Sequence, residues 1–99
     1  MRKEDFKEWL SAKIKKKPAS DCVSRCRTVE KVLVVDLDEE YARDRGTGVL
    51  SRMQYSIEDE RSAKQPPADF HFKDNANIRY RMTNLRSAVN KYFEFCKED

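Results

Sequence analysis

A single histidine limits the catalytic chemistry that this sequence could support. A Ser-His-Asp triad, a Cys-His pair and most zinc sites would each require it. This residue, His71, lies between Phe70 and Phe72 in a proline-flanked stretch, and no serine of the chain lies in a nucleophile motif. We therefore interpret His71 as structural or merely exposed, assign no catalytic residue, and predict that the protein is not an enzyme.

The cysteines offer a second kind of chemistry, metal binding by thiolates. Cys22 and Cys26 stand four residues apart on one face of an expected helix, and Cys96 could supply a third ligand. The Cys-x-x-Cys spacing that is usual for zinc sites is absent. Because buried cysteine commonly acts as a small hydrophobic residue, we expect free thiols that fill the core, with no metal or cofactor bound.

An acidic cluster could hold a divalent cation. Its members are Asp36, Asp38, Glu39, Glu40 and Asp44. The glycine and the regular alternation of an EF-hand loop are missing, and acidic residues are typical of the first turn of a helix. We therefore predict no metal site here. The same cluster, within the acidic segment 36–60, remains an alternative surface for a protein partner.

Basic and amide side chains indicate a binding function. Arginine, asparagine and threonine together are typical of contacts to phosphates and base edges. Two such stripes run along the surface of the expected last helix. One consists of Arg79, Thr83, Arg86 and Asn90, and the other of Arg81, Asn84 and Lys91. Further basic residues flank Pro18: Lys13, Lys15, Lys16, Lys17, Arg25 and Arg27. The same residues would equally suit a solvated face whose charges are paired with acidic neighbours.

Length and charge limit the kind of protein. The 99 residues are enough for one domain, 1–99, with a single modest core. The net charge is only +3, but residues 1–17 hold seven basic and three acidic side chains, whereas 36–60 hold three basic and eight acidic. No apolar run is long enough to span a membrane, and the N-terminus lacks the apolar segment of a secretion signal. We therefore expect a cytoplasmic protein that does not enter membranes.

Helical periodicity dominates the sequence. In 75–96, apolar residues recur at alternating steps of four and three, which predicts one long helix capped by Asp74 or Asn75. These apolar residues are Ile78, Met82, Leu85, Val89, Tyr92 and Cys96. About 20 residues would span roughly 30 Å, the width of a small domain. We therefore predict an all-α fold, a compact bundle of four to five helices with the C-terminal helix as its central post.

Shorter helices should pack around this post. They are expected over 3–16, from about 21 to 34, from 36 onward and over 57–64, with an ordered loop at 68–74. Pro18 should end the first of them, because proline disfavours the helical conformation of the residue before it. Ser20, Asp36 and Ser56 are the expected N-caps of the other three.

Three short patterns occur in order along the chain. They are Phe6-x-x-Trp9-Leu10, Ser20-Asp21-Cys22-Val23-Ser24-Arg25, and Ser87-Ala88-Val89 followed by Lys91-Tyr92-Phe93-x-Phe95. In this order they are similar to the N-terminal core-binding (SAM-like) domain of tyrosine recombinases and phage integrases. That domain is a bundle of four to five helices that clamps DNA. The catalytic domain of the recombinases is missing from this chain.

The resemblance implies a non-catalytic module that binds DNA. It would place DNA-facing residues at Lys16, Lys17, Ser24, Arg25, Arg79 and Arg86. The basic faces add Lys13, Lys15 and Asn90 to this set. The alternative is a protein-interaction module, such as an adaptor or a phage- or plasmid-encoded inhibitor, that acts through the acidic segment 36–60.

Overall fold

The computed structural model describes residues 1–67, 70–72 and 77–98. These residues form six α-helices joined by turns and loops, and no strand. The helices are α1 (Lys3–Ser11), α2 (Lys16–Leu33), α3 (Leu37–Asp44), α4 (Thr47–Ser51), α5 (Ile57–Arg61) and α6 (Ile78–Glu98). The predicted all-α fold is confirmed. The radius of gyration is 13.7 Å, close to the ~13 Å expected for a compact domain of 100 residues. No helix in these ranges is both long and apolar enough to cross a membrane.

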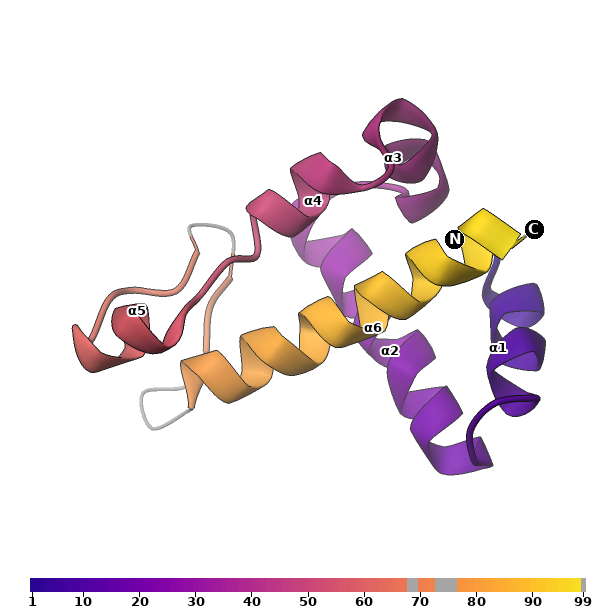
Figure 1. Cartoon of the computed structure of the whole chain (residues 1–99), viewed down its shortest axis with the longest axis horizontal. Coiled ribbons are helices and arrows are strands. Elements are labelled where there is room, and N and C mark those ends of the chain that lie inside the picture. The colour runs from indigo at the N-terminus through magenta and orange to yellow at the C-terminus, as the bar shows by residue number, and fades with distance from the viewer. Residues whose placement is uncertain (68–69, 73–76, 99) are drawn as a thin grey trace.

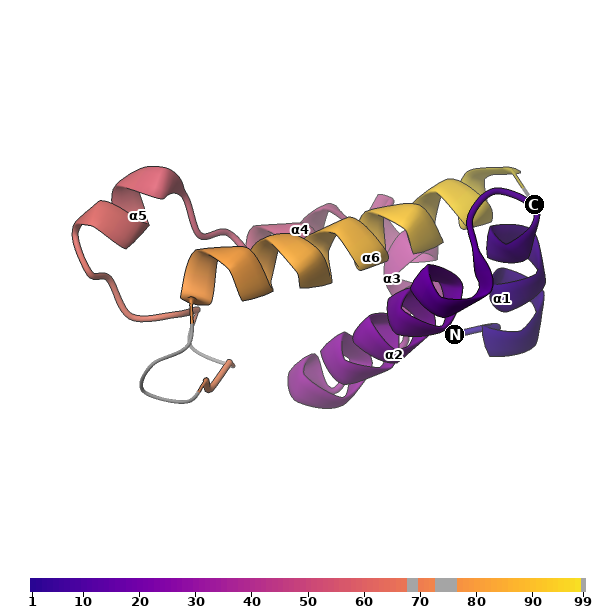
Figure 2. The ribbon, with the colours of Figure 1, turned by 90° about the horizontal axis from the view of Figure 1, so that it is seen from below.

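The long helix α6 is the central element of the fold, as predicted. Figure 1 shows α6 crossing the molecule diagonally, with α2 running across it from behind. It contacts α1, α2, α3 and α5. In Figure 2, α6 lies above α2, and α5 lies beyond the N-terminal end of α6. The buried residues of α6 are Met82, Leu85, Ala88, Val89, Tyr92, Phe93 and Phe95. Ala88, Phe93 and Phe95 widen the predicted apolar stripe, which lets α6 pack against several helices at once.

An aromatic cluster joins α1 to the C-terminal half of α6. Phe6 is fully buried, and its ring lies 4.8 Å from that of Tyr92 and 5.6 Å from that of Phe95, measured between centroids. The Trp9 ring lies 6.1 Å from that of Phe6 and 5.8 Å from that of Phe95. Edge-to-face and tilted ring pairs of this kind add stability beyond the area they bury.

The boundary between the first two helices differs from the prediction. α1 ends at Ser11 and α2 begins at Lys16, so Pro18 lies in the first turn of α2. Proline is tolerated there because the first N–H groups of a helix have no partner within it. The expected cap Ser20 therefore lies inside α2, and Lys15 occupies the N-cap position without a side-chain hydrogen bond.

The N-caps of α3 and α5 are those that the sequence predicts. The Asp36 side chain accepts a hydrogen bond from the backbone N–H of Asp38. Ser56 and Asp59 form a reciprocal capping box at the start of α5. This helix ends at Arg61, three residues before the expected end at 64, and is only five residues long.

The start of α6 is capped by a residue that the sequence did not single out. The side chain of Asn77 accepts a hydrogen bond from the backbone N–H of Tyr80 at 3.0 Å. Its carbonyl accepts one from the N–H of Arg81, also at 3.0 Å. The expected caps Asp74 and Asn75 lie outside the described residues.

Among the described residues, three with positive φ shape the turns around α3: Val34, Arg45 and Gly46. Val34 ends α2 with φ 55° and ψ 54°, and it is 87% exposed. Gly46, with φ 82°, separates α3 from α4. A Cβ atom on Gly46 would lie 2.1 Å from Cε2 of Phe93, so the buried ring requires glycine at this position. This close contact holds the turn before α4 against α6.

Candidate nucleic-acid interface

A groove between α2 and the N-terminal half of α6 brings together basic, amide and aromatic side chains. Its volume is about 540 Å³. The lining residues are Arg25, Thr28, Phe72, Asn77, Tyr80, Arg81, Asn84 and Leu85, and we call this site the α2–α6 groove. Leu85 is a buried core residue, whereas Arg25, Asn77, Tyr80 and Arg81 are exposed. The groove therefore has a buried apolar residue in its lining and a polar, cationic rim.

Helical spacing accounts for the position of most of these side chains. Arg25 and Thr28 are three residues apart on α2, and Tyr80 and Asn84 are four apart on α6. Such pairs lie on the same face of a helix. The remaining aromatic residue comes from the segment before α6. Phe72 stacks on Phe70 with ring centroids 6.4 Å apart, and Phe70 is itself buried.

The two arginines of the groove have unused charge. Neither Arg25 nor Arg81 forms an ion pair with any residue that the structure describes. Arg79, two residues before Arg81, is instead paired with Glu60, whose segment lies beside the start of α6. A guanidinium without a carboxylate partner remains available to a phosphate, which it can bind through two parallel hydrogen bonds.

The structure separates the predicted DNA-facing residues into several places. Arg25 lines the groove, and the neighbouring Ser24 is exposed on α2. The lysine run, Lys13, Lys15, Lys16 and Lys17, is exposed where α1 leads into α2. Lys17, the member of the run nearest in sequence, lies about 12 Å from Arg25 along the axis of α2, by the rise per residue. Lys13 also stacks over the Trp9 ring at 4.8 Å. The run is therefore a neighbouring basic patch and not part of the groove.

Arg86 and Asn90 belong to a different hollow on α6. They line a recess of about 300 Å³ together with Thr83, Ser87, Lys91 and Glu94. Nε of Arg86 is buried and has no hydrogen-bond partner among the described residues. Of the first predicted stripe on α6, every residue except Arg79 lines this recess. The second predicted stripe contributes Arg81 and Asn84 to the α2–α6 groove.

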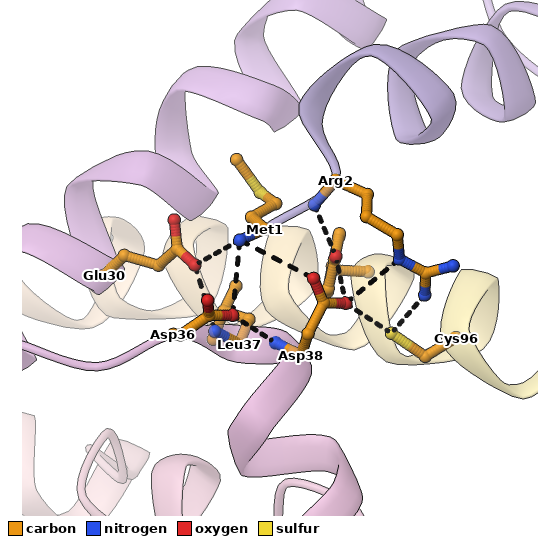
Figure 3. Close-up of polar contacts among 8 residues, drawn as sticks. Met1, Arg2, Glu30, Asp36, Leu37, Asp38 and Cys96 are labelled. Atoms are coloured by element: carbon orange, nitrogen blue, oxygen red, sulfur yellow. Dashed lines mark hydrogen bonds and ion pairs between the residues drawn. The ribbon is translucent and has the colours of Figure 1, made fainter.

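The acidic cluster is largely engaged within the chain. Figure 3 shows the amino group of Met1 surrounded by the carboxylates of Glu30, Asp36 and Asp38, at 3.2, 3.3 and 3.7 Å. Arg2 reaches Asp38 at 3.3 Å and Sγ of Cys96 at 3.6 Å. We call these residues, with Tyr92, the N-terminal cluster. It ties the start of the chain to α2, α3 and α6.

Tyr92 has a central place in this cluster. Its hydroxyl donates a hydrogen bond to Asp38 and accepts one from the backbone N–H of Arg2 at 2.8 Å. Burial, together with the Asp38 carboxylate, raises the pKa of Tyr92, so that its hydroxyl stays protonated and donates. The thiol of Cys96 lies 3.7 Å from the same carboxylate, and burial is the main reason that its pKa is raised.

The other acidic residues of the cluster differ in their surroundings. Glu40 is buried and pairs with Arg43. The Asp44 carboxylate accepts hydrogen bonds from the N–H groups of Gly46 and Gly48, both at 3.0 Å. Glu39 is exposed and has no ion pair in the described part of the chain. Four of the five predicted partner-binding carboxylates therefore contact groups within their own chain.

Two of the three cysteines are neighbours, and the third lies further along α6. Cys22 and Cys26 are buried, and their Sγ atoms lie 3.8 and 3.2 Å from the Ala88 carbonyl. Cys96 is two helical turns further along α6, about 12 Å by the rise per residue. His71 is exposed. Within the described ranges, no three His, Cys, Asp or Glu side chains are grouped as a metal would require.

Sequence reasoning missed half of the groove. Thr28, Phe72, Asn77 and Tyr80 were not among the expected binding residues. Tyr80, Arg81 and Asn84 fall on the polar side of the α6 periodicity, so an exposed tyrosine there was a usable signal. Phe72 lines the groove together with residues of α2 and α6, and no helical spacing in the sequence encodes that tertiary arrangement.

Comparisons with known proteins add no relative to this picture. No protein-family model matches the sequence, and comparisons with curated proteins and with solved structures gave no significant match. The resemblance to the recombinase core-binding domain stays a prediction.

Proposed function

We propose that this protein is a non-catalytic DNA-binding module and that the α2–α6 groove is its contact surface. The observation that carries the proposal is the pair of arginines, Arg25 and Arg81, that line one groove without a carboxylate partner in the described part of the chain. The guanidinium fork matches the geometry of phosphate as well as that of carboxylate, and Arg is typical of phosphate recognition.

The remaining groups of the groove are suited to a nucleic acid. Asn84 carries both donors and an acceptor for base edges, and the hydroxyl of Thr28 keeps a free acceptor position while it donates to the Ser24 carbonyl at 3.1 Å. Exposed lysines at the α1–α2 junction would extend the positive surface beyond the groove. Binding would be driven by neutralised phosphates and released counterions, so it should weaken steeply with salt.

The alternative function, protein binding through the acidic segment 36–60, has less support. Asp36, Asp38, Glu40 and Asp44 each contact a cation or backbone N–H of this chain. A partner would have to break those contacts to use them. Of the five predicted residues, Glu39 is the one that is exposed and without such a contact in the described part of the chain.

The test is fluorescence anisotropy of a labelled DNA at several salt concentrations. Arg25→Ala and Arg81→Ala should each weaken binding and lower the salt slope by about 1, the value for one lost phosphate contact. Arg27→Ala is the matched control, since Arg27 is exposed on the same helix but does not line the groove. Equal effects of all three substitutions would contradict the groove as the contact surface. Absence of binding at low salt, or binding that does not depend on salt, would contradict the function.

A further inference from the structure

The rim of the α2–α6 groove carries an exposed aromatic ring. Tyr80 is 66% exposed, and its ring stacks on no other ring in the described part of the chain. Two other large hydrophobic side chains are comparably exposed, Val34 and Ile57, and neither lines this groove. Tyr80 therefore differs from them in standing beside unpaired arginines and amide groups.

The shape of the site limits the form of nucleic acid that fits it. A groove of about 540 Å³ is of the size that holds small molecules, roughly 300–1,000 Å³. Duplex DNA is read by convex elements, such as a helix, that enter its major groove. In a duplex the bases are stacked inside, whereas in a single strand they can turn outward into a recess and stack on aromatic side chains.

The chemistry around Tyr80 matches such a base. Asn77 uses its side-chain oxygen to cap α6, which leaves its amide N–H groups as donors. Asn84 can both donate and accept, and Phe72 also lines the groove. Arg25 and Arg81 then provide cations for the phosphates on either side of the base. A stacking ring within a cationic groove is the usual arrangement of proteins that bind single strands.

We propose that the α2–α6 groove binds single-stranded DNA, with one base stacked on the ring of Tyr80 and the adjoining phosphates held by Arg25 and Arg81. This inference rests on the proposed function, because it names the form of DNA that the same site takes.

The test compares a labelled single-stranded oligonucleotide of mixed sequence with the duplex of the same length, by anisotropy at low salt with the full chain. The single strand should bind more tightly than the duplex. Tyr80→Ala should weaken single-strand binding about tenfold, the effect of losing one stacked base. Tyr80→Phe keeps the ring and should stay within about twofold of the parent. Ile57→Ala is the matched control, since it removes another exposed apolar side chain, one that does not line the groove.

The outcomes separate the inference from the function on which it rests. If the duplex binds at least as tightly as the single strand, or if Tyr80→Ala binds as well as the parent while Arg25→Ala does not, base stacking is wrong and DNA binding stands. If neither DNA binds at low salt, both proposals are wrong. Circular dichroism of each variant verifies that Tyr80→Ala, an exposed substitution, leaves the helices intact.

Discussion

Two polar regions lie at the two ends of α6, and they use similar residues in opposite ways. In the N-terminal cluster, Arg2 contacts Asp38 and Cys96, and the nearby carboxylates all have partners. In the α2–α6 groove, Arg25 and Arg81 pair with no carboxylate among the described residues. Arginine therefore forms stabilising intramolecular contacts at one end of α6, whereas at the other end it is a cation available for binding.

The difference teaches that the role of a charge depends on what the fold places beside it. Saturated pairs such as Arg2 with Asp38 hold elements together, and opening them leaves partly buried charges without partners. Unpaired cations near a groove contribute little to folding, which makes them available for binding. The two regions should accordingly respond in opposite ways to substitution.

The largest expected effect is on the stability of the N-terminal cluster. Asp38→Ala removes the acceptor of the Tyr92 hydroxyl and a partner of both Arg2 and the Met1 amino group. We expect the free energy of unfolding to fall by about 3 kcal/mol, since hydrogen bonds to charged groups are among the stronger ones. Urea unfolding followed by circular dichroism measures this loss.

The matched change in the groove gives the contrast. Arg81→Ala should alter the free energy of unfolding by no more than about 0.5 kcal/mol, as for other surface substitutions, while it weakens DNA binding. Asp38→Ala should lower the free energy of unfolding and leave the affinity for DNA unchanged below the melting transition. If Asp38→Ala weakens DNA binding as strongly as Arg81→Ala, the two regions are not independent.

A smaller effect is expected at the turn that leads into the N-terminal cluster. Val34 adopts a left-handed conformation that is unfavourable for a β-branched residue, and its side chain is 87% exposed. Val34→Gly removes this strain with little loss of buried surface, and should raise the free energy of unfolding by about 1 kcal/mol.

Val34→Ala is the control for that substitution. It removes the branch but keeps Cβ, so it should recover only part of the gain. Thermal melts of the three proteins under one condition provide the comparison. A Val34→Gly protein that melts below the parent would mean that the side chain makes a contact worth more than the strain.

The smallest effect is the dependence of stability on pH. Burial works against the charged form of the Met1 amino group, but Glu30 and Asp36 raise its pKa above the ordinary 8.0. Its contribution to stability is therefore complete below pH 8.0 and is lost as the pH rises through the higher folded-state value. Burial also opposes ionisation of Asp36, yet the Asp38 N–H and the amino group lower its pKa below 3.8. That contribution is complete above pH 3.8 and is lost as the pH falls through the lower folded-state value.

Melting temperatures measured from acid to alkaline pH should thus show a plateau between these limits and a decline on both sides. The acid decline should be modest, because Asp36 is partly exposed and water screens its charge. Asp36→Asn should reduce that decline and lower the plateau. A melting temperature that keeps rising above pH 8 would contradict a stabilising role for the Met1 amino group.

The sequence predicted the helices better than it predicted their partners. The apolar spacing from Met82 to Tyr92 identified α6 and its buried face, because a local period of 3.6 residues is written in the sequence itself. Ser56 was identified as a cap because capping, too, depends on the residue type beside the start of a helix. The prediction that Pro18 ends the first helix was wrong. A proline can either follow the end of one helix or lie in the first turn of the next, and the residue type alone does not distinguish the two cases.

The site was predicted only in part because pairing is a long-range property. Arg25 and Arg81 look no different in sequence from Arg2 or Arg79, and only the fold shows which of them meet a carboxylate. The Tyr92–Asp38 hydrogen bond joins residues 54 positions apart. No spacing rule of helices reaches that far, so the division of charges into paired and unpaired sets became visible with the structure.

The contact between Gly46 and the Phe93 ring has a consequence for evolution. A Cβ atom at position 46 would overlap the ring, and the φ of 82° also disfavours residues other than glycine, so a lineage that keeps this turn and the large ring on α6 should keep the glycine. Glycine at position 46 and a large ring at position 93 are therefore expected to persist together. This pair would help to recognise a distant relative whose surface, groove included, had diverged beyond recognition.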